Sequence, residues 1–145
     1  MHRVSGDILL VEDNPHDIEI TLHTFRILNI PNRIDVVRDG EEALKYIFRE
    51  GQYAQSDHNI ALILLDVKLP KLTGIEVLKQ IKSDNRTKLI PVVMLSASSH
   101  EQDVSKSYDL GANSYIIKPV EFDVFEKTVR DLTVYWLHHN QSAYP

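Results

Sequence analysis

Four short apolar runs in this 145-residue chain are each followed at once by polar residues that can take part in chemistry. Such continuous runs are typical of parallel strands that are buried on both faces of a sheet. Because the carboxyl ends of parallel strands meet at one edge, the polar residues are expected to share a pocket. The runs and their followers are 8–11 with Glu12 and Asp13, 60–65 with Asp66, 91–95 with Ser96, and 115–117 with Lys118.

Segments with helical spacing separate the runs, so strand-like and helix-like stretches alternate along the chain. Asp39 and Thr73 are each followed three residues later by Glu, which is a capping-box signal for a helix start. The alternation predicts an α/β fold, a doubly wound five-stranded parallel sheet with helices on both faces. The expected strands are 8–11, 34–37, 60–65, 91–95 and 115–117, and the expected helices are about 15–28, 40–51, 74–83, 99–110 and 122–137.

The composition suits one globular domain, because 43% of the residues are hydrophobic and 26% are charged. We expect a single domain with a core of about residues 7–138 and no effector domain. The formal net charge of -5 and the lack of a Lys/Arg cluster argue against nucleic-acid binding. No cysteine, signal peptide or long apolar stretch is present in the sequence, which predicts a cytoplasmic protein without a membrane partner.

The residues after the runs predict a metal-assisted aspartyl phosphate site. Adjacent carboxylates such as Glu12 and Asp13 repel each other unless a cation is near, and their oxygens suit Mg²⁺. Asp66 would stand beside them if its strand neighbours the first strand, and a carboxylate is a competent covalent acceptor. Lys118 would offset the repulsion, and Pro119 after it permits a cis peptide bond that would fix its direction.

Each of these residues also has a simpler interpretation. Asp13 could cap the first helix, and Asp66 could be a turn residue. Lys118 could be a surface lysine, and Ser96 could be a turn former, as serines after strands often are. The joint placement of these residues at one edge favours the functional interpretation.

The motifs resemble those of the receiver domains of two-component response regulators, from Ile8 to about Leu137. Within that family, segment 36–44, the long loop after the second helix and the final helix with Trp136 resemble single-domain regulators paired with bacterial phytochrome kinases. The resembling motifs are Leu10-Val11-Glu12-Asp13-Asn14, then Leu64-Leu65-Asp66-Val67-Lys68-Leu69-Pro70 with Thr73-Gly74, then Leu95-Ser96-Ala97, and Gly111-Ala112-Asn113-Ser114-Tyr115-Ile116-Ile117-Lys118-Pro119.

This resemblance implies the flavodoxin-like strand order 2-1-3-4-5 and a regulatory protein rather than an enzyme that acts on other substrates. A sensor histidine kinase would transfer a phosphoryl group from its phosphohistidine to Asp66. Asp13, Asp66 and the backbone carbonyl of Lys68 would ligate Mg²⁺, with Glu12 acting through a bound water. Glu12 stands where Asp is commoner, and the side chain of Lys68 would face the mouth of the site.

The resemblance also implies how the signal leaves the site. Lys118, Ser96 and the backbone of Ala97 would bind the phosphoryl oxygens. Ser96 and Tyr115 would form a switch, because the aromatic changes rotamer when the hydroxyl moves. Segment 99–110 has the weakest apolar stripe of the expected helices and is predicted to be the most mobile. The output would be a downstream protein partner or a phosphorelay.

Three rival functions differ in what they require. A haloacid-dehalogenase-like phosphatase carries a second Asp two positions after its nucleophile, where this chain has Lys68. A nucleotide-binding domain needs a glycine-rich loop after the first strand, where this chain has residues 12–15, two of them acidic. A phosphorylation-independent, receiver-like adaptor protein remains open, because every site residue could persist in a scaffold.

The final helix predicts a homodimer. Its inward stripe already covers the sheet, so Val124, Tyr135 and Leu137 are expected to leave apolar area on another face of the helix. The alternative is that the helix merely runs past the sheet and that its end packs on neighbouring loops, because scattered exposed apolar residues are common. The predicted inward stripe consists of Phe122, Phe125, Val129, Leu132 and Trp136.

Overall fold

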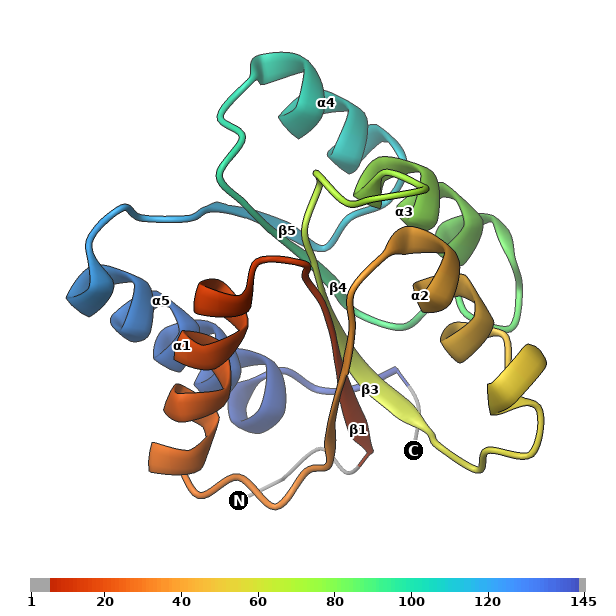
Figure 1. Cartoon of the computed structure of the whole chain (residues 1–145), viewed down its shortest axis with the longest axis horizontal. Coiled ribbons are helices and arrows are strands. Elements are labelled where there is room, and N and C mark those ends of the chain that lie inside the picture. Colours follow the sequence, from red (N-terminus) through yellow and green to blue (C-terminus); the bar gives the residue numbers. More distant parts are fainter. Residues whose placement is uncertain (1–5, 144–145) are drawn as a thin grey trace.

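The computed structural model describes residues 6–143 and contains one five-stranded sheet (Figure 1). Every pair of neighbouring strands is parallel, and the order is β2-β1-β3-β4-β5. Both the predicted fold class and the strand order are therefore confirmed. The strands are β1 (Asp7–Val11), β2 (Ile34–Val37), β3 (Ile60–Leu65), β4 (Val92–Ser96) and β5 (Ser114–Ile117).

Helices cover both faces of the sheet, with α1 and α5 together on one side and α2, α3 and α4 on the other (Figure 1). None of the helices within residues 6–143 is long and apolar enough to cross a membrane. The helices are α1 (Pro15–Ile27), α2 (Gly40–Ile47), α3 (Gly74–Ser83), α4 (Glu101–Asp109) and α5 (Phe122–Val134), with a 3₁₀ turn at Gly51–Tyr53 and a π-helical turn at Tyr135–His139.

Alternate side chains of the central strands fill two apolar layers. Leu9 and Val11 of β1 pack toward α2 and α3, whereas Ile8 and Leu10 pack toward α1 and α5. Both sets are buried, which explains why the central strands show no polar alternation in the sequence. The strands that carry the acidic residues are therefore fixed from both sides.

The expected end of the second helix is too late by about four residues. Helix α2 ends at Ile47, and Arg49 has a φ of 56°, which lies in the left-handed region and stops the helix. A 3₁₀ turn then begins at Gly51. Helix α4 begins at Glu101 rather than Ser99, and its one buried residue is Ser107. Helix α4 is thinly anchored, but the prediction that its apolar stripe is the weakest is wrong, because α1 is less amphipathic. The mobility of α4 stays a prediction.

The predicted faces of the last helix are partly wrong. Phe122 is 48% exposed instead of covering the sheet, and Leu137 is fully buried instead of facing outward. Leu137 lies in the π-helical turn Tyr135–His139, in which the N–H of Asn140 donates to the carbonyl of Tyr135 five residues earlier. Val124 and Tyr135 are exposed, as expected.

Candidate metal and phosphoryl site

The carboxyl ends of the strands bring the predicted acidic residues together at one edge of the sheet. One carboxylate oxygen each from Glu12, Asp13 and Asp66 lies within 4.8 Å of the other two. Glu12 and Asp66 are buried, whereas Asp13 is exposed. Three oxygen donors that are open to solvent on one side suit a hard divalent cation that keeps several waters.

Lys118, which follows β5, points its ammonium group into this acidic cluster. Its Nζ donates to Glu12, to Asp17 at 3.0 Å and to Asp66 at 3.1 Å. Burial alone would lower the pKa of Lys118, but the bond to Glu12 and the charge of Asp66 raise it above its usual value. The structure has no cis peptide bond within residues 6–143, so the bond that Pro119 permits to be cis is trans. The carboxylates hold the direction of the lysine instead.

Glu12 is the most constrained acid of the site. Its side chain is 4% exposed, and its Oε2 accepts the backbone N–H groups of Asp13 and Asn14 at 3.1 and 3.2 Å. Burial raises the pKa of Glu12 to about 7; Lys118 opposes this shift, and the charge of Asp66 adds to it. A buried carboxylate with a raised pKa gains from a nearby cation that stabilises its charged form.

Asp13 is not the cap of the first helix. Asn14 is the N-cap of α1, and its Oδ1 accepts the backbone N–H groups of His16 and Asp17 at 2.9 and 3.2 Å. The simpler interpretation of Asp13 is therefore wrong. The side chain of Asp13 remains exposed beside Glu12 and Asp66, where it can contribute an oxygen to a metal ion.

The loop after β3 holds Asp66 by a close backbone contact. A Cβ on Gly74 would lie 1.8 Å from the carbonyl oxygen of Asp66, so only glycine fits there. The N–H of Gly74 also donates to the carbonyl of Val67 at 2.7 Å. Lys68 is exposed in this loop, and its N–H donates to Asp66 Oδ1 at 3.4 Å. The start of α3 thus fixes the segment that carries the predicted acceptor.

Ser96 and Tyr115 meet through the loop after β4. Ser96 is buried at the end of β4, and its Oγ accepts the N–H of Ser98 at 3.1 Å. The hydroxyl of Tyr115 donates to the carbonyl of Ser98 at 2.8 Å. Ala97 lies between them with an exposed side chain. Because Ser98 also bonds Asp103 of α4, this loop connects the site to that helix.

Asp17 belongs to the site, although the sequence analysis did not select it. It lies in the first turn of α1 and pairs with Lys118 across 101 residues of sequence. Acidic residues are common in the first turn because they interact favourably with the helix dipole, so the sequence carries no signal that separates Asp17 from the others. Three carboxylates therefore pair with the Lys118 ammonium group at this edge, those of Glu12, Asp17 and Asp66, and Asp13 lies beside Glu12 and Asp66.

This arrangement defines a class of protein, a doubly wound α/β domain with an oxygen-rich cation site, a neighbouring acceptor carboxylate and a lysine at the carboxyl edge. The family model described as the response regulator receiver domain matches residues 8–130. The chain belongs to this family.

Two known proteins are similar to this chain in sequence. FilR2, a probable methanogenesis regulatory protein of Methanothrix harundinacea, is 40% identical over 139 residues, or 95% of this chain and 88% of that protein. The response regulator Rcp1 of Synechocystis is 38% identical over 130 residues, or 90% of this chain and 88% of that protein.

Two solved structures are similar over almost the whole chain. The phosphorylated cyanobacterial phytochrome response regulator RcpA matches with a TM-score of 0.92 at 41% identity, covering 97% of this chain and 99% of that one. The Mn²⁺-bound form of Rcp1 matches with a TM-score of 0.90 at 36% identity, covering 94% of this chain and 98% of that one. The protein is thus a response regulator of the two-component type.

Proposed function

We propose that Asp66 is the residue that accepts the phosphoryl group. In the transfer, the phosphorus–nitrogen bond of a phosphohistidine breaks and a bond from phosphorus to a carboxylate oxygen of Asp66 forms. The observation that carries this proposal is the position of Asp66, 3.1 Å from the Lys118 ammonium and inside the cluster with Glu12 and Asp13. A transferring phosphoryl group needs mainly positioning and positive charge, and this edge supplies both.

The metal of this site is proposed to be Mg²⁺. Glu12, Asp13 and Asp66 would hold it together with the backbone carbonyl of Lys68, and Glu12 would act through a bound water. The hard oxygen donors and the excess of carboxylates over ammonium groups support this choice. The bound ion would neutralise negative charge on the phosphoryl oxygens.

The groups around Asp66 are proposed to bind the phosphoryl oxygens and to report their presence. Lys118, Ser96 and the backbone N–H of Ala97 would donate to these oxygens. Rotation of the Ser96 hydroxyl toward these oxygens would move its Oγ away from the N–H of Ser98, from which it accepts a bond of 3.1 Å. Tyr115 bonds the same segment, so a shift there would move the tyrosine and with it the connection to α4.

The test is mass spectrometry of the protein after incubation with acetyl phosphate and Mg²⁺. We expect one labile phosphoryl adduct on the parent protein and none on Asp66→Asn, with circular dichroism unchanged. Asp123→Asn, which removes an exposed carboxylate from α5, is the matched control and should form the adduct normally. A parent protein without any adduct would favour the phosphorylation-independent adaptor, and a full adduct on Asp66→Asn would reject this residue as acceptor.

The kinase partner is proposed to be a phytochrome-type sensor histidine kinase in the cytoplasm. The support is the similarity to RcpA, which is described as a cyanobacterial phytochrome response regulator. The output would pass to a downstream protein or along a phosphorelay. Phosphotransfer profiling against the sensor kinases of the same cell tests the partner directly.

A homodimer through the outer face of α5 is also proposed. Val124 and Tyr135 are 45% and 49% exposed on this helix, and Phe122 at its start adds further apolar area. Sedimentation velocity should show a dimer that Tyr135→Glu and Val124→Glu dissociate. Leu89→Glu alters an equally exposed apolar residue in the loop before β4 and should leave the dimer intact. A monomer at high micromolar concentration would reject this proposal.

A further inference from the structure

We propose that Asp17 is a positioning residue for Lys118, which keeps the ammonium group beside Asp66 when the site is loaded. This inference rests on the proposed function of the site and adds a residue to it. It starts from the number of donors available, because an ammonium group has three N–H donors and no acceptor. All three have carboxylate partners in this structure, on Glu12, Asp17 and Asp66.

Binding of a metal ion and a phosphoryl group would change two of these three partners of Lys118. Glu12 belongs to the oxygen cluster that would hold a metal ion, and a cation there competes with the ammonium for its charge. Asp66 would become the carrier of the phosphoryl group, which gives one of its carboxylate oxygens to phosphorus. Asp17 lies outside the oxygen cluster, so it is the one partner whose charge stays available to Lys118.

The geometry of Asp17 suits a fixed anchor. Its backbone N–H donates to Asn14 Oδ1 at 3.2 Å, and its carbonyl accepts the hydroxyl of Thr21 at 2.8 Å, so the first turn of α1 fixes the backbone. Its side chain makes no capping bond, and its bond within residues 6–143 is the one to Lys118 at 3.0 Å. The lysine side chain is 7% exposed and the aspartate side chain is 21% exposed, so solvent screens this pair less than a surface pair.

A simpler role for Asp17 would be that of an acid in the first turn of a helix, which stabilises α1 without acting on the site. Such a role predicts a change in stability alone. A positioning role predicts weaker binding of a phosphoryl mimic, because a lysine without its anchor must be ordered again when the mimic binds. The two roles therefore differ in a binding constant measured at saturating Mg²⁺.

The experiment titrates beryllofluoride, a phosphoryl mimic, into the full chain at saturating Mg²⁺ and follows the bound signal by fluorine NMR. Asp17→Asn keeps the shape of the side chain and removes its charge, and we expect about tenfold weaker binding of beryllofluoride. The matched control is Glu19→Gln, which removes an exposed charge from the same helix and should bind like the parent. In a Lys118→Gln background, Asp17→Asn should have no further effect, because its partner is gone.

Two results would overturn this inference. The first is parent-like binding by Asp17→Asn, and the second is an equal loss with and without Lys118. Folding of each variant is checked by its circular dichroism. If the parent itself binds no beryllofluoride, the proposed function fails and this inference falls with it, whereas a normal parent with a normal Asp17→Asn variant rejects only the role of Asp17.

Discussion

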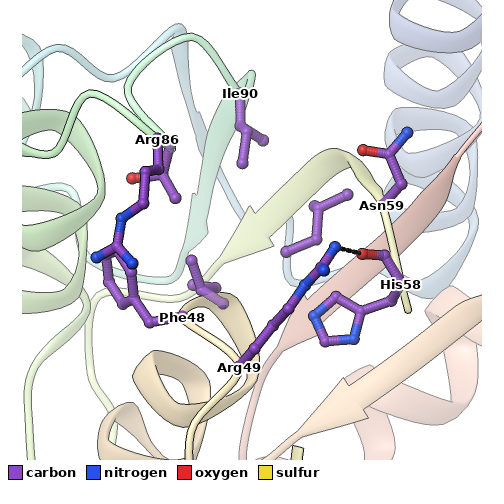
Figure 2. Close-up of a pocket in the computed structure, with 9 residues that line it drawn as sticks. Phe48, Arg49, His58, Asn59, Arg86 and Ile90 are labelled. Atoms are coloured by element: carbon purple, nitrogen blue, oxygen red, sulfur yellow. Dashed lines mark hydrogen bonds between the residues drawn. The ribbon is translucent and has the colours of Figure 1, made fainter. Parts of the chain in front are cut away.

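The charged side chains at the two edges of the sheet differ in their burial and in their partners. At the amino edge, a cavity of about 320 Å³ is lined by apolar side chains, by polar ones and by two arginines, Arg49 and Arg86 (Figure 2). Each arginine has a local partner: Arg49 donates to the backbone carbonyl of His58, and the charge of Arg86 is paired with Asp84 at 2.8 Å. Arg86 also lies over the ring of Phe48, 5.0 Å from its centre. Both arginine residues are exposed.

The carboxyl edge holds charges that are buried and unequal in number. Glu12, Asp66 and Lys118 have side chains less than 10% exposed, and carboxylates outnumber the ammonium group. Taking such charges out of water costs stability that pairing repays only in part. The two edges therefore differ in what their charges suggest. An exposed charge with a local partner needs no ligand, whereas buried carboxylates that outnumber their cations suggest a site that is completed by a bound cation.

The largest expected effect comes from removing the only ammonium group that the structure places in the acidic cluster. Lys118→Met leaves buried carboxylates without a partner and should lower the free energy of unfolding of the metal-free protein by about 3 kcal/mol. Mg²⁺ should restore part of this loss, because a cation then replaces the missing charge. Urea denaturation with and without Mg²⁺ measures both values.

Lys127→Met is the control for this change. Its ammonium pairs with Asp131 on the surface of α5 and is 75% exposed, so its loss should leave the unfolding midpoint unchanged. Equal losses for the two lysine variants would contradict the contrast between buried and exposed charge.

The second-largest expected effect is a dependence of the Mg²⁺ affinity on pH. The pKa of Glu12 in the folded, metal-free protein is about 7, above the usual 4.5, so folding favours its protonated form and this contribution is lost as pH rises through 7. Mg²⁺ needs the charged form, so its dissociation constant should be about tenfold larger at pH 6 than at pH 8. Calorimetric titration checks this, and Glu12→Gln should flatten the dependence. A flat profile for the parent would show that Glu12 stays charged.

A smaller effect is expected from the loop that links the site to α4. Binding of beryllofluoride should change hydrogen exchange in residues 101–109 of the parent, and Ser96→Ala should reduce this change by about half or more. Ser105→Ala, in the exposed face of α4, is the control and should respond like the parent. An unchanged response in Ser96→Ala would mean that the signal takes another route.

The smallest effect is expected at the amino edge. Arg86→Ala removes an exposed, locally matched charge, so the unfolding midpoint and the yield of phosphoryl adduct should both equal those of the parent. Denaturation and mass spectrometry on the same samples test this. A clear loss of adduct would show that the two edges are coupled.

The amino-acid sequence by itself determined the fold and most of the site. Unbroken apolar runs at 8–11 and 60–65 require burial on both faces, and this leads to a parallel sheet with crossover helices. Parallel strands place their carboxyl ends together, so Glu12, Asp66 and Lys118 had to meet once the strand order was known. Local pattern predicted the parallel direction of the strands, whereas the strand order 2-1-3-4-5 followed from the resemblance to receiver domains.

Only the tertiary structure decided two kinds of feature: contacts between residues that are far apart in the sequence, and the direction in which the side chains at the end of a helix point. Nothing local distinguishes Asp17 from an ordinary first-turn acid, and its pairing with Lys118 arises because α1 starts beside the end of β5. The sequence likewise did not predict the π-helical turn in which Leu137 is buried. Periodicity describes one element at a time, whereas charge pairing and helix phase are settled when elements pack against each other.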